Sequence, residues 1–236
     1  MSTLIFDIET VGEDFDALDD TTQKVLTRWI ERESMSDDEY NKELKEMKAG
    51  MGFSPLTGQI VAIGVLDAQH DRAVVYYQAP GEKPEEFEED GVKYKPMAEK
   101  EMLESFWQGA AKYDTFVGFN SSAFDAPFLM VRSAIHGLRP TKNLLSNRYL
   151  TSQRYEAQHV DLLDQLSFYG ALKRKGSLHL WCRAFGIESP KGEGVSGDDV
   201  APMFRAKQYL EIARYNVGDL RATRALYDYW KKYLAL

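Results

Sequence analysis

The sequence predicts a mixed α/β domain built on one sheet. Strand-like apolar segments alternate along the chain with segments whose apolar residues recur at helical spacing. Apart from one polar insertion, the order is strand, strand, strand, helix, strand, helix, which is typical of a single mixed sheet flanked by helices. The 236 residues are 44% hydrophobic and contain no internal repeat, so we expect one domain with a well-filled core over residues 1–236.

The first predicted strand, Leu4–Thr10, places two carboxylates two residues apart in an apolar run. Side chains in a strand alternate between faces, so Asp7 and Glu9 project to one side while Phe6 and Ile8 project to the other. Burying two like charges together is costly unless a cation lies between them. The pair therefore indicates a metal site, although a strand that ends at a solvent-facing turn would also explain it.

A polar, helix-prone insertion follows at about residues 13–57. Apolar residues recur at helical spacing from about residue 21 to 48, and Ser36 followed by Glu39 forms a capping-box pattern, so we expect two amphipathic helices. Between Glu13 and Gly50 the chain holds twelve acids and six bases, a balance of 6 − 12 = −6. This segment supplies much of the net charge of −8.

Glycine and proline at residues 50–58 break the helical pattern, and regular elements then follow to about residue 119. The expected elements are a buried strand at 59–67, its hairpin partner at 73–78, a polar loop at 80–96, a helix at about 98–113 and a short strand at 115–119.

A second carboxylate follows this short strand. The strand ends near Asn120, a helix beginning at residues 120–122 is expected to continue to about residue 136, and Asp125 falls in its first turn. Ligands tend to collect at this end of an α/β sheet. Taken alone, Asp125 is also explained as an acid that complements the dipole at a helix N-terminus.

The third group lies on a predicted helix that covers about residues 206–233. Tyr215 and Asp219 are four residues apart on this helix, so their side chains are neighbours on one face. A hydrogen-bonded surface pair would be the usual explanation of this spacing. The combination with Asp7, Glu9 and Asp125 is much less expected by chance.

The stretches Phe6–Thr10, Asn120–Asp125 and Tyr215–Asp219 together resemble motifs Exo I, II and III of the DEDD, or DnaQ-like, 3′–5′ exonucleases. They most resemble the proofreading exonuclease domains of family B DNA polymerases. The resemblance implies a ribonuclease H-like fold with two divalent ions and release of nucleoside 5′-monophosphates from a 3′ end. Tyrosine four residues before the last aspartate, with Arg214 at the position of the alternative histidine, matches the DEDDy subtype.

The resemblance also implies a role for each residue of the catalytic set. Asp7 would bridge two Mg²⁺ or Mn²⁺ ions, with Glu9 and Asp219 completing the site that activates water and Asp125 serving the second ion. Carboxylate oxygens are the ligands that these hard ions prefer. Tyr215 would orient the nucleophile, because a phenol with a pKa near 10 is a poor base at neutral pH.

Residues that hold the substrate are also carried over from the family. Thr10, Asn120 and Phe124 match positions that hold the terminal nucleotides, and Phe124 could stack on a base or belong to the core. Asp161 and Asp164 resemble a supporting segment, and we do not assign them as ligands. The insertion at 13–57 is longer than the family's usual link after Exo I.

The charge pattern bears on the substrate. Residues 126–155 contain five bases and no acid, so a basic stretch follows the Asp125 motif. A polyanionic strand would favour this stretch, although five charges over thirty residues are also typical of an ordinary solvated face. The acidic insertion should lie away from the strand or restrict access to it. DNA 3′ ends, single-stranded by preference, are the expected substrate. An exoribonuclease that trims RNA and a non-catalytic ribonuclease H-like binding module are the alternatives.

The remaining features concern location and partners. The sequence has no run of eighteen apolar residues and no basic, apolar leader, so neither a membrane span nor secretion is expected. The single cysteine, Cys182, cannot form an internal disulfide, which fits the cytoplasm. No polymerase domain follows residue 236, so a separate polymerase or repair protein is a candidate partner.

Overall fold

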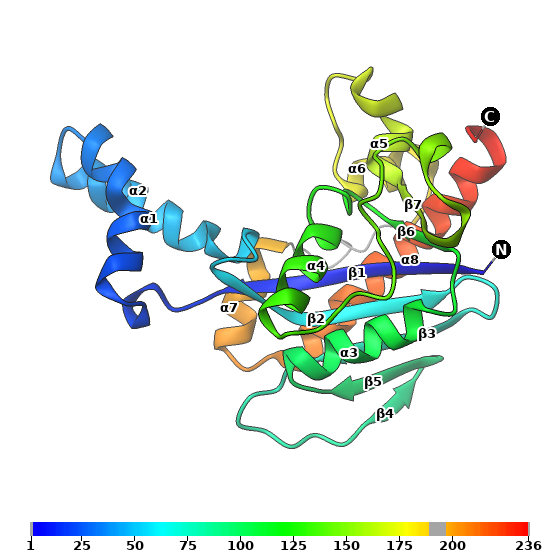
Figure 1. The fold of residues 1–236 in the computed structure, drawn as a ribbon, viewed down its shortest axis with the longest axis horizontal. Helices are drawn as coiled ribbons and strands as arrows, with labels where there is room; N and C mark the ends of the chain where they lie inside the picture. The colour runs from blue at the N-terminus through cyan, green and yellow to red at the C-terminus, as the bar shows by residue number, and fades with distance from the viewer. Residues whose placement is uncertain (1, 189–196, 236) are drawn as a thin grey trace.

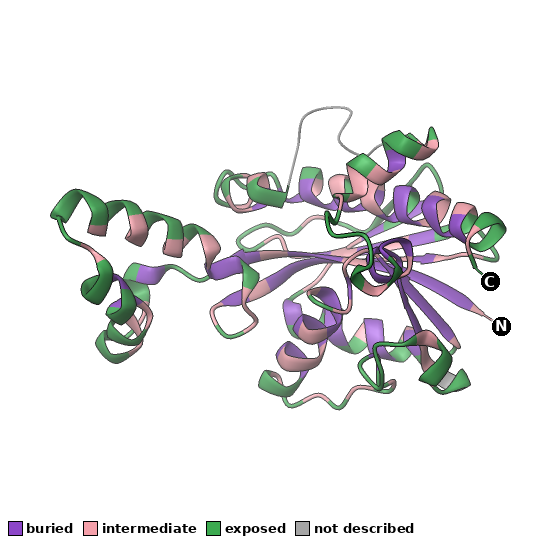
Figure 2. Ribbon diagram, turned by 90° about the horizontal axis from the view of Figure 1, so that it is seen from above, coloured by how far each residue is buried: buried purple, intermediate pink, exposed green. Residues whose placement is uncertain are grey.

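A seven-stranded mixed sheet with helices on both faces forms the body of the protein in the computed structural model, which describes residues 2–188 and 197–235 (Figures 1 and 2). The strand order is β4-β5-β3-β2-β1-β6-β7. The strands are β1 (Thr3–Gly12), β2 (Gly58–Asp67), β3 (Arg72–Tyr77), β4 (Phe87–Glu89), β5 (Val92–Pro96), β6 (Thr115–Gly118) and β7 (Gln158–Asp161). The longer helices are α1 (Asp20–Glu33), α2 (Asp37–Gly50), α3 (Glu99–Ala110), α4 (Asp125–Ile135), α5 (Leu162–Leu166), α6 (Leu178–Phe185), α7 (Val200–Arg205) and α8 (Tyr209–Tyr233).

Strand direction changes at the middle of the sheet. Strands β1, β2 and β3 pair antiparallel, as the predicted hairpin requires, while β6 runs parallel to β1 and β7 runs parallel to β6. Parallel neighbours need a crossover connection, and α3 and α4 lie on the connections that precede β6 and β7. The sheet is therefore mixed, as the order of elements predicts.

The two faces of β1 pack against different helices, as the alternation of the sequence predicts. Ile5 and Val11 belong to a core cluster with α8, whereas Phe6 and Ile8 belong to a second cluster with α3 and α4. Asp7 and Glu9 lie at odd-numbered positions of β1, as Ile5 and Val11 do, so their side chains project to the same face. They therefore lie on the α8 face of the sheet.

The insertion at residues 13–57, here called the arm, is a helical hairpin that projects from the far end of β1 (Figures 1 and 2). Its helices α1 and α2 confirm the two predicted helices. Ser36 caps α2 by accepting a hydrogen bond from the Glu39 backbone N–H at 3.2 Å. Only Thr27 and Ile30 of α1, and no residue of α2, are buried, so the arm contributes little to the core.

Three boundaries differ from those that the sequence predicts. The expected loop at 80–96 contains strands β4 and β5, because β5 pairs with the outer edge of β3 and buries Val92 and Tyr94. The helix expected from residue 120 begins only at Asp125. The last helix begins at Tyr209 rather than 206, and a separate short helix, α7, precedes it.

Among the described residues, no helix has both the length and the apolar character needed to cross a membrane.

Candidate active site

Asp7, Glu9 and Asp219 converge on the α8 face of β1. One carboxylate oxygen from each residue lies within 4.8 Å of the others. The strand spacing sets Asp7 and Glu9 side by side, and packing of α8 over β1 and β2 brings Asp219 to them. Residues far apart in sequence thus form one acidic cluster.

Asp125 reaches the same end of β1 from the other side of the sheet. Strand β6 pairs with β1 only at Thr3–Ile5, so the edge of β1 beyond Ile5 has no strand partner there. Asp125, the first residue of α4, accepts a hydrogen bond from the Ile8 backbone N–H at 3.0 Å. The carboxylate thereby satisfies a buried N–H that the short β6 leaves open.

Burial and mutual repulsion oppose ionisation of these acids. Burial raises the pKa of Asp7 well above its ordinary value, and the charges of Asp125, Glu9 and Asp219 raise it further. The pKa of Glu9 is raised by burial and by the charge of Asp219. Burial likewise raises the pKa of Asp125 to about 7, against the opposing hydrogen bond from Ile8.

The donor set fits divalent cations. Glu9 Oε1 is buried and has no hydrogen-bond partner among the described residues, so its lone pairs are left for a ligand from outside the chain. A hard cation would both use this oxygen and relieve the repulsion between the acids. Three of the four carboxylates that the sequence singles out, Asp7, Glu9 and Asp219, thus lie close enough together to share a cation, and Asp125 lies at the backbone of β1 beside them.

Tyr215 lies one helical turn before Asp219 on α8, close enough for the two side chains to interact electrostatically. Burial raises the pKa of Tyr215, and the neighbouring charge of Asp219 raises it further. The phenol therefore keeps its proton near neutral pH and can donate a hydrogen bond. The expected proximity of Tyr215 and Asp219 is confirmed.

The motif reasoning misses one member of the cluster, Asn216. Its side chain is fully buried on α8, and its Nδ2 donates a hydrogen bond of 2.7 Å to Asp7 Oδ2. The sequence signals are a polar residue inside an apolar helix stripe and a glycine, Gly64, in the middle of a buried strand. Gly64 faces Asp7 across the β1–β2 pair.

Of the three expected substrate-binding residues, Thr10 and Phe124 contact the base of the arm. Thr10 follows an irregularity in the β1–β2 pairing and donates its hydroxyl hydrogen to the Gly52 carbonyl at 2.7 Å. The Phe124 ring meets Phe53 edge-on, with ring centroids 6.4 Å apart. Phe124 is half-buried and also packs on the core through Phe128, so it has both a core side and an open side.

Asn120 adopts a left-handed backbone conformation with φ of 59°, which asparagine tolerates better than most residues. The carboxylate of Asp161 accepts hydrogen bonds from the backbone N–H groups of Asn120 and Ser122, at 3.0 and 2.9 Å. Asp161 therefore holds the turn that delays α4 until Asp125. This contact explains why the helix begins later than the sequence predicts.

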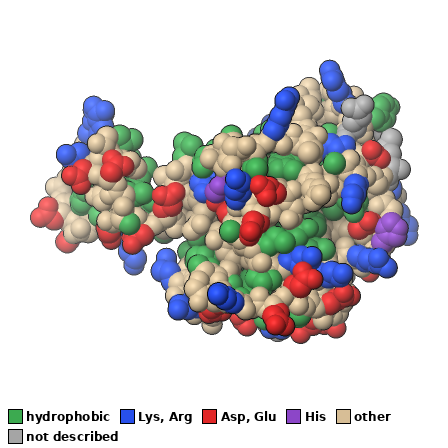
Figure 3. Space-filling view, turned by 60° about the horizontal axis from the view of Figure 1, so that its bottom comes forward, with side chains coloured by type: hydrophobic (Ala, Val, Ile, Leu, Met, Phe, Trp, Pro, Cys, Tyr) green, Lys and Arg blue, Asp and Glu red, His purple; other side chains and the backbone are tan. Residues whose placement is uncertain are grey.

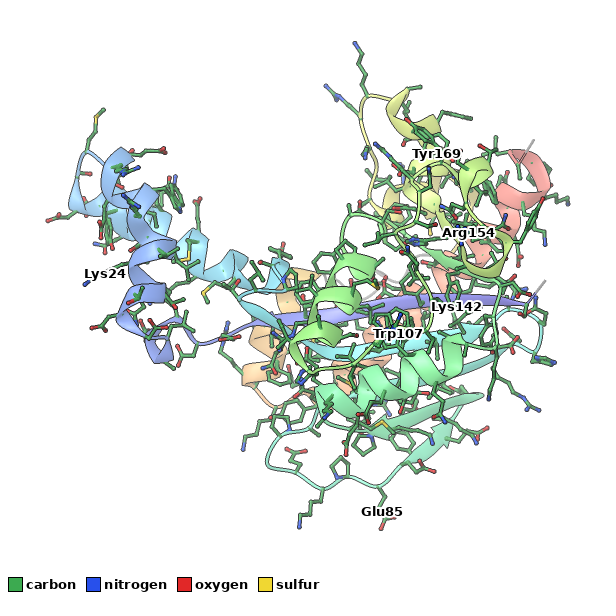
Figure 4. The ribbon with its side chains drawn as sticks, viewed as in Figure 1. Lys24, Glu85, Trp107, Lys142, Arg154 and Tyr169 are labelled. Atoms are coloured by element: carbon green, nitrogen blue, oxygen red, sulfur yellow. The ribbon has the colours of Figure 1, made fainter. Side chains whose placement is uncertain are left out.

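Four of the five bases of the basic stretch lie between α4 and α5. The fifth, Arg132, is part of α4, where it is buried and pairs with Glu99 at 2.7 Å, so it is not available to a substrate. Arg148 forms two hydrogen bonds with the buried carboxylate of Asp164, at 2.8 and 2.6 Å, so part of its charge is already compensated. Figure 4 shows Lys142, Arg154 and Tyr169 in this region, on the opposite side of the molecule from Lys24 of the arm. Figure 3 shows the arm as a separate lobe that carries acidic side chains.

The sheet order, the strand directions and the helices on both faces define a ribonuclease H-like domain. The sequence model of one family, described as a predicted 3′–5′ exonuclease related to the exonuclease domain of PolB, matches residues 53–233. The chain belongs to this family. The match leaves out β1 with Asp7 and Glu9, and most of the arm.

Solved structures extend the similarity of fold to nearly the whole chain. The family B DNA polymerase from the hyperthermophilic archaeon Pyrobaculum calidifontis aligns with a TM-score of 0.59 and 17% sequence identity. The alignment covers 98% of this chain but 24% of the polymerase, so the chain spans about a quarter of that protein. A search of curated proteins finds no match.

Proposed function

We propose that this chain is a metal-dependent 3′–5′ exonuclease of the DEDDy type that acts on single-stranded DNA 3′ ends and releases nucleoside 5′-monophosphates. The observation that carries the proposal is the convergence of Asp7, Glu9 and Asp219 within 4.8 Å, with Asp125 at the same end of β1. The buried Glu9 Oε1 without a hydrogen-bond partner among the described residues supports it, because a bound cation would satisfy this oxygen.

The acidic residues would hold two Mg²⁺ or Mn²⁺ ions. Such ions, when bound, supply the Lewis acidity that generates a nucleophile from water and stabilises a leaving oxygen in phosphodiester hydrolysis. Asp7 and Glu9 are fixed by the central strand, and Asp219 by the long helix α8, so the ligands stand on rigid elements.

Tyr215 would act as a hydrogen-bond donor. Its raised pKa keeps the hydroxyl protonated, which excludes it as a general base near neutral pH. From one turn before Asp219 the O–H can orient the attacking water or a phosphate oxygen. Its contribution is to positioning, and the reaction should retain activity without it.

Substrate would reach the site beside Thr10, Asn120 and Phe124. Phe124 presents a half-buried ring, and Phe53 beside it is 60% exposed, so both rings offer faces on which a base can stack. The basic loops between α4 and α5 would face the phosphates, and the acidic arm points away from them. Unpaired ends suit such a site because their bases are free to stack.

Two alternative functions, RNA trimming and non-catalytic binding, can be distinguished from the proposed one by experiment. The motifs contain no feature that distinguishes RNA from DNA through its 2′-OH, so RNA trimming is the nearer alternative. A non-catalytic binding module would be expected to lack at least one carboxylate or the tyrosine, and this chain has all five.

The experiment incubates the protein with 5′-labelled single-stranded DNA, duplex DNA and RNA of one sequence in Mg²⁺ or Mn²⁺. We expect a ladder of 3′-shortened products, formed fastest on single-stranded DNA and abolished by EDTA. A substrate with a blocked 3′ end is the control and should stay intact. If RNA is shortened preferentially, RNA rather than DNA is the substrate. Cleavage in EDTA would contradict the proposal altogether.

A further inference from the structure

Asn216 contacts Asp7 through its amide group. Its Nδ2 donates a hydrogen bond to Asp7 Oδ2 at 2.7 Å, and the side chain lies close enough to Glu9 to lower the pKa of that acid. Ionised carboxylates only accept hydrogen bonds, whereas an amide nitrogen donates them. The amide donor therefore lies beside two acids that repel each other.

The opposite end of the same amide is unsatisfied. Asn216 Oδ1 is buried and has no hydrogen-bond partner among the described residues. An unpaired buried carbonyl is destabilising, and leucine, which is similar in size, would fill the space without that penalty. Packing alone therefore does not explain an asparagine at this position.

Gly64 makes room for this amide. A Cβ atom at position 64 would overlap Asn216 Oδ1 and would lie 2.7 Å from Leu220 Cδ1. Gly64 lies in the middle of β2 and directly opposite Asp7, where glycine weakens a strand and is expected only when another group must approach closely. The lack of a side chain at Gly64 thus leaves the space that the Asn216 amide occupies next to Asp7.

We propose that Asn216 is a positioning residue, which orients the Asp7 carboxylate beside Glu9 for a divalent cation and which needs glycine at position 64 to reach it. This inference rests on the proposed metal-dependent function. It extends that function to two residues outside the acidic set and the tyrosine. Hydrogen-bonded neighbours of metal ligands typically affect metal affinity by about 10- to 100-fold.

The first test measures Mn²⁺ binding by calorimetry, without any nucleic acid, on wild-type protein and on Asn216→Leu and Asn216→Ser. Both variants remove the amide donors, and Ser creates less steric demand if Leu disturbs the fold. We expect Mn²⁺ affinity to fall by about 10- to 100-fold in each. Thermal melts in EDTA show whether each variant is folded before it is titrated.

The second test is a double-mutant cycle with Gly64→Ala. In the wild-type background the new methyl group should displace the amide and weaken Mn²⁺ binding to a similar extent. In the Asn216→Ser background it should have little further effect, because the amide is already gone. Additive losses would mean that Gly64 acts through packing alone and would overturn the proposed coupling.

The matched control is Thr223→Val, which changes another buried polar residue of α8, two helical turns after Asn216. It should leave Mn²⁺ affinity within about twofold of wild type, so an equal loss there would overturn a specific role for Asn216. Wild-type affinity retained in both Asn216 variants would also overturn it. If wild-type protein itself binds no Mn²⁺, the proposed function fails together with the inference.

Discussion

The arm and the candidate active site are both rich in acidic residues, but their charges are stabilised in opposite ways. The arm's acids are almost all exposed, and Asp19 accepts hydrogen bonds from the Thr21 and Thr22 backbones at the N-terminus of α1. Hydrogen bonds from Thr22 lower the pKa of Asp19. In the site, Glu9 and Asp125 are buried, and burial raises the pKa of both.

The difference shows that the number of acids in a segment does not predict a cation site. Water and helix N–H groups stabilise the arm's charges without any ion. In the site, neutral groups such as the Asn216 amide and the Ile8 N–H donate hydrogen bonds to Asp7 and Asp125. The proposed metal dependence therefore rests on burial and convergence of the acids, and the following changes test this contrast.

The largest difference should appear in activity. Asp7→Ala removes the acid at the centre of the cluster and should lower turnover of single-stranded DNA by more than about 10³-fold. The matched change in the arm, Asp37→Asn with Asp38→Asn, should leave turnover within about twofold. Initial rates on 5′-labelled DNA in Mn²⁺ measure both, and a large loss in the arm variant would contradict the contrast.

The second difference is in the stability of metal-free protein. The pKa of Asp125 is about 7, above the ordinary value of 3.8, so the folded state binds more protons than the unfolded state between these pH values. Stability should therefore fall as pH rises from about 4 to about 7. Asp125→Asn keeps an acceptor for the Ile8 N–H and should remove the contribution of Asp125 to this fall, up to about 4 kcal/mol at 1.36 kcal/mol per pKa unit, while Asp7 and Glu9 maintain the rest.

Urea unfolding in EDTA at several pH values measures this effect. Asp19→Asn is the comparison, because the pKa of Asp19 is lowered and its stabilising effect is present above the unfolded pKa and lost as pH falls. The two variants should thus change the pH profile in opposite directions. If Asp125→Asn leaves the pH dependence of stability unchanged, burial does not raise the pKa of this carboxylate.

The third change is Tyr215→Phe, which deletes one hydroxyl and leaves every carboxylate in place. We expect single-turnover rates to fall by about 10- to 100-fold, at or below the low end for groups that handle protons or water. Mn²⁺ affinity should stay near the wild-type value. An unchanged rate, alongside an inactive Asp219→Ala variant, would mean that Tyr215 only packs on its helix.

The smallest effect should come from surface charge. Arg154→Glu, on the basic loops, should weaken binding of single-stranded DNA several-fold and reduce the slope of log affinity against log salt by about 1. Lys24→Glu makes the same reversal on the arm and should change neither quantity (Figure 4). Arg154 is preferred to Arg148, which is held by Asp164. If both charge reversals weaken DNA binding equally, the bound DNA lies closer to the arm than we propose.

The sequence by itself determines the features that depend on local geometry. The two-residue period of a strand places Asp7 and Glu9 on one face, and the 3.6-residue turn of a helix places Tyr215 beside Asp219. Repeating apolar positions likewise predict most strands and helices, including the two helices of the arm. The sequence does not predict the end of an element where a distant residue sets it. Asp161, for example, holds the turn before α4, so this helix begins later than its sequence pattern predicts.

Only the tertiary structure decides how the acids are held together. Strand β6 stops early and so leaves the Ile8 N–H to Asp125, and the missing side chain of Gly64 admits Asn216 to Asp7. Each contact joins residues that are remote in sequence. No periodicity encodes such contacts, because they depend on the register of β2 against β1 and on where α8 crosses both strands.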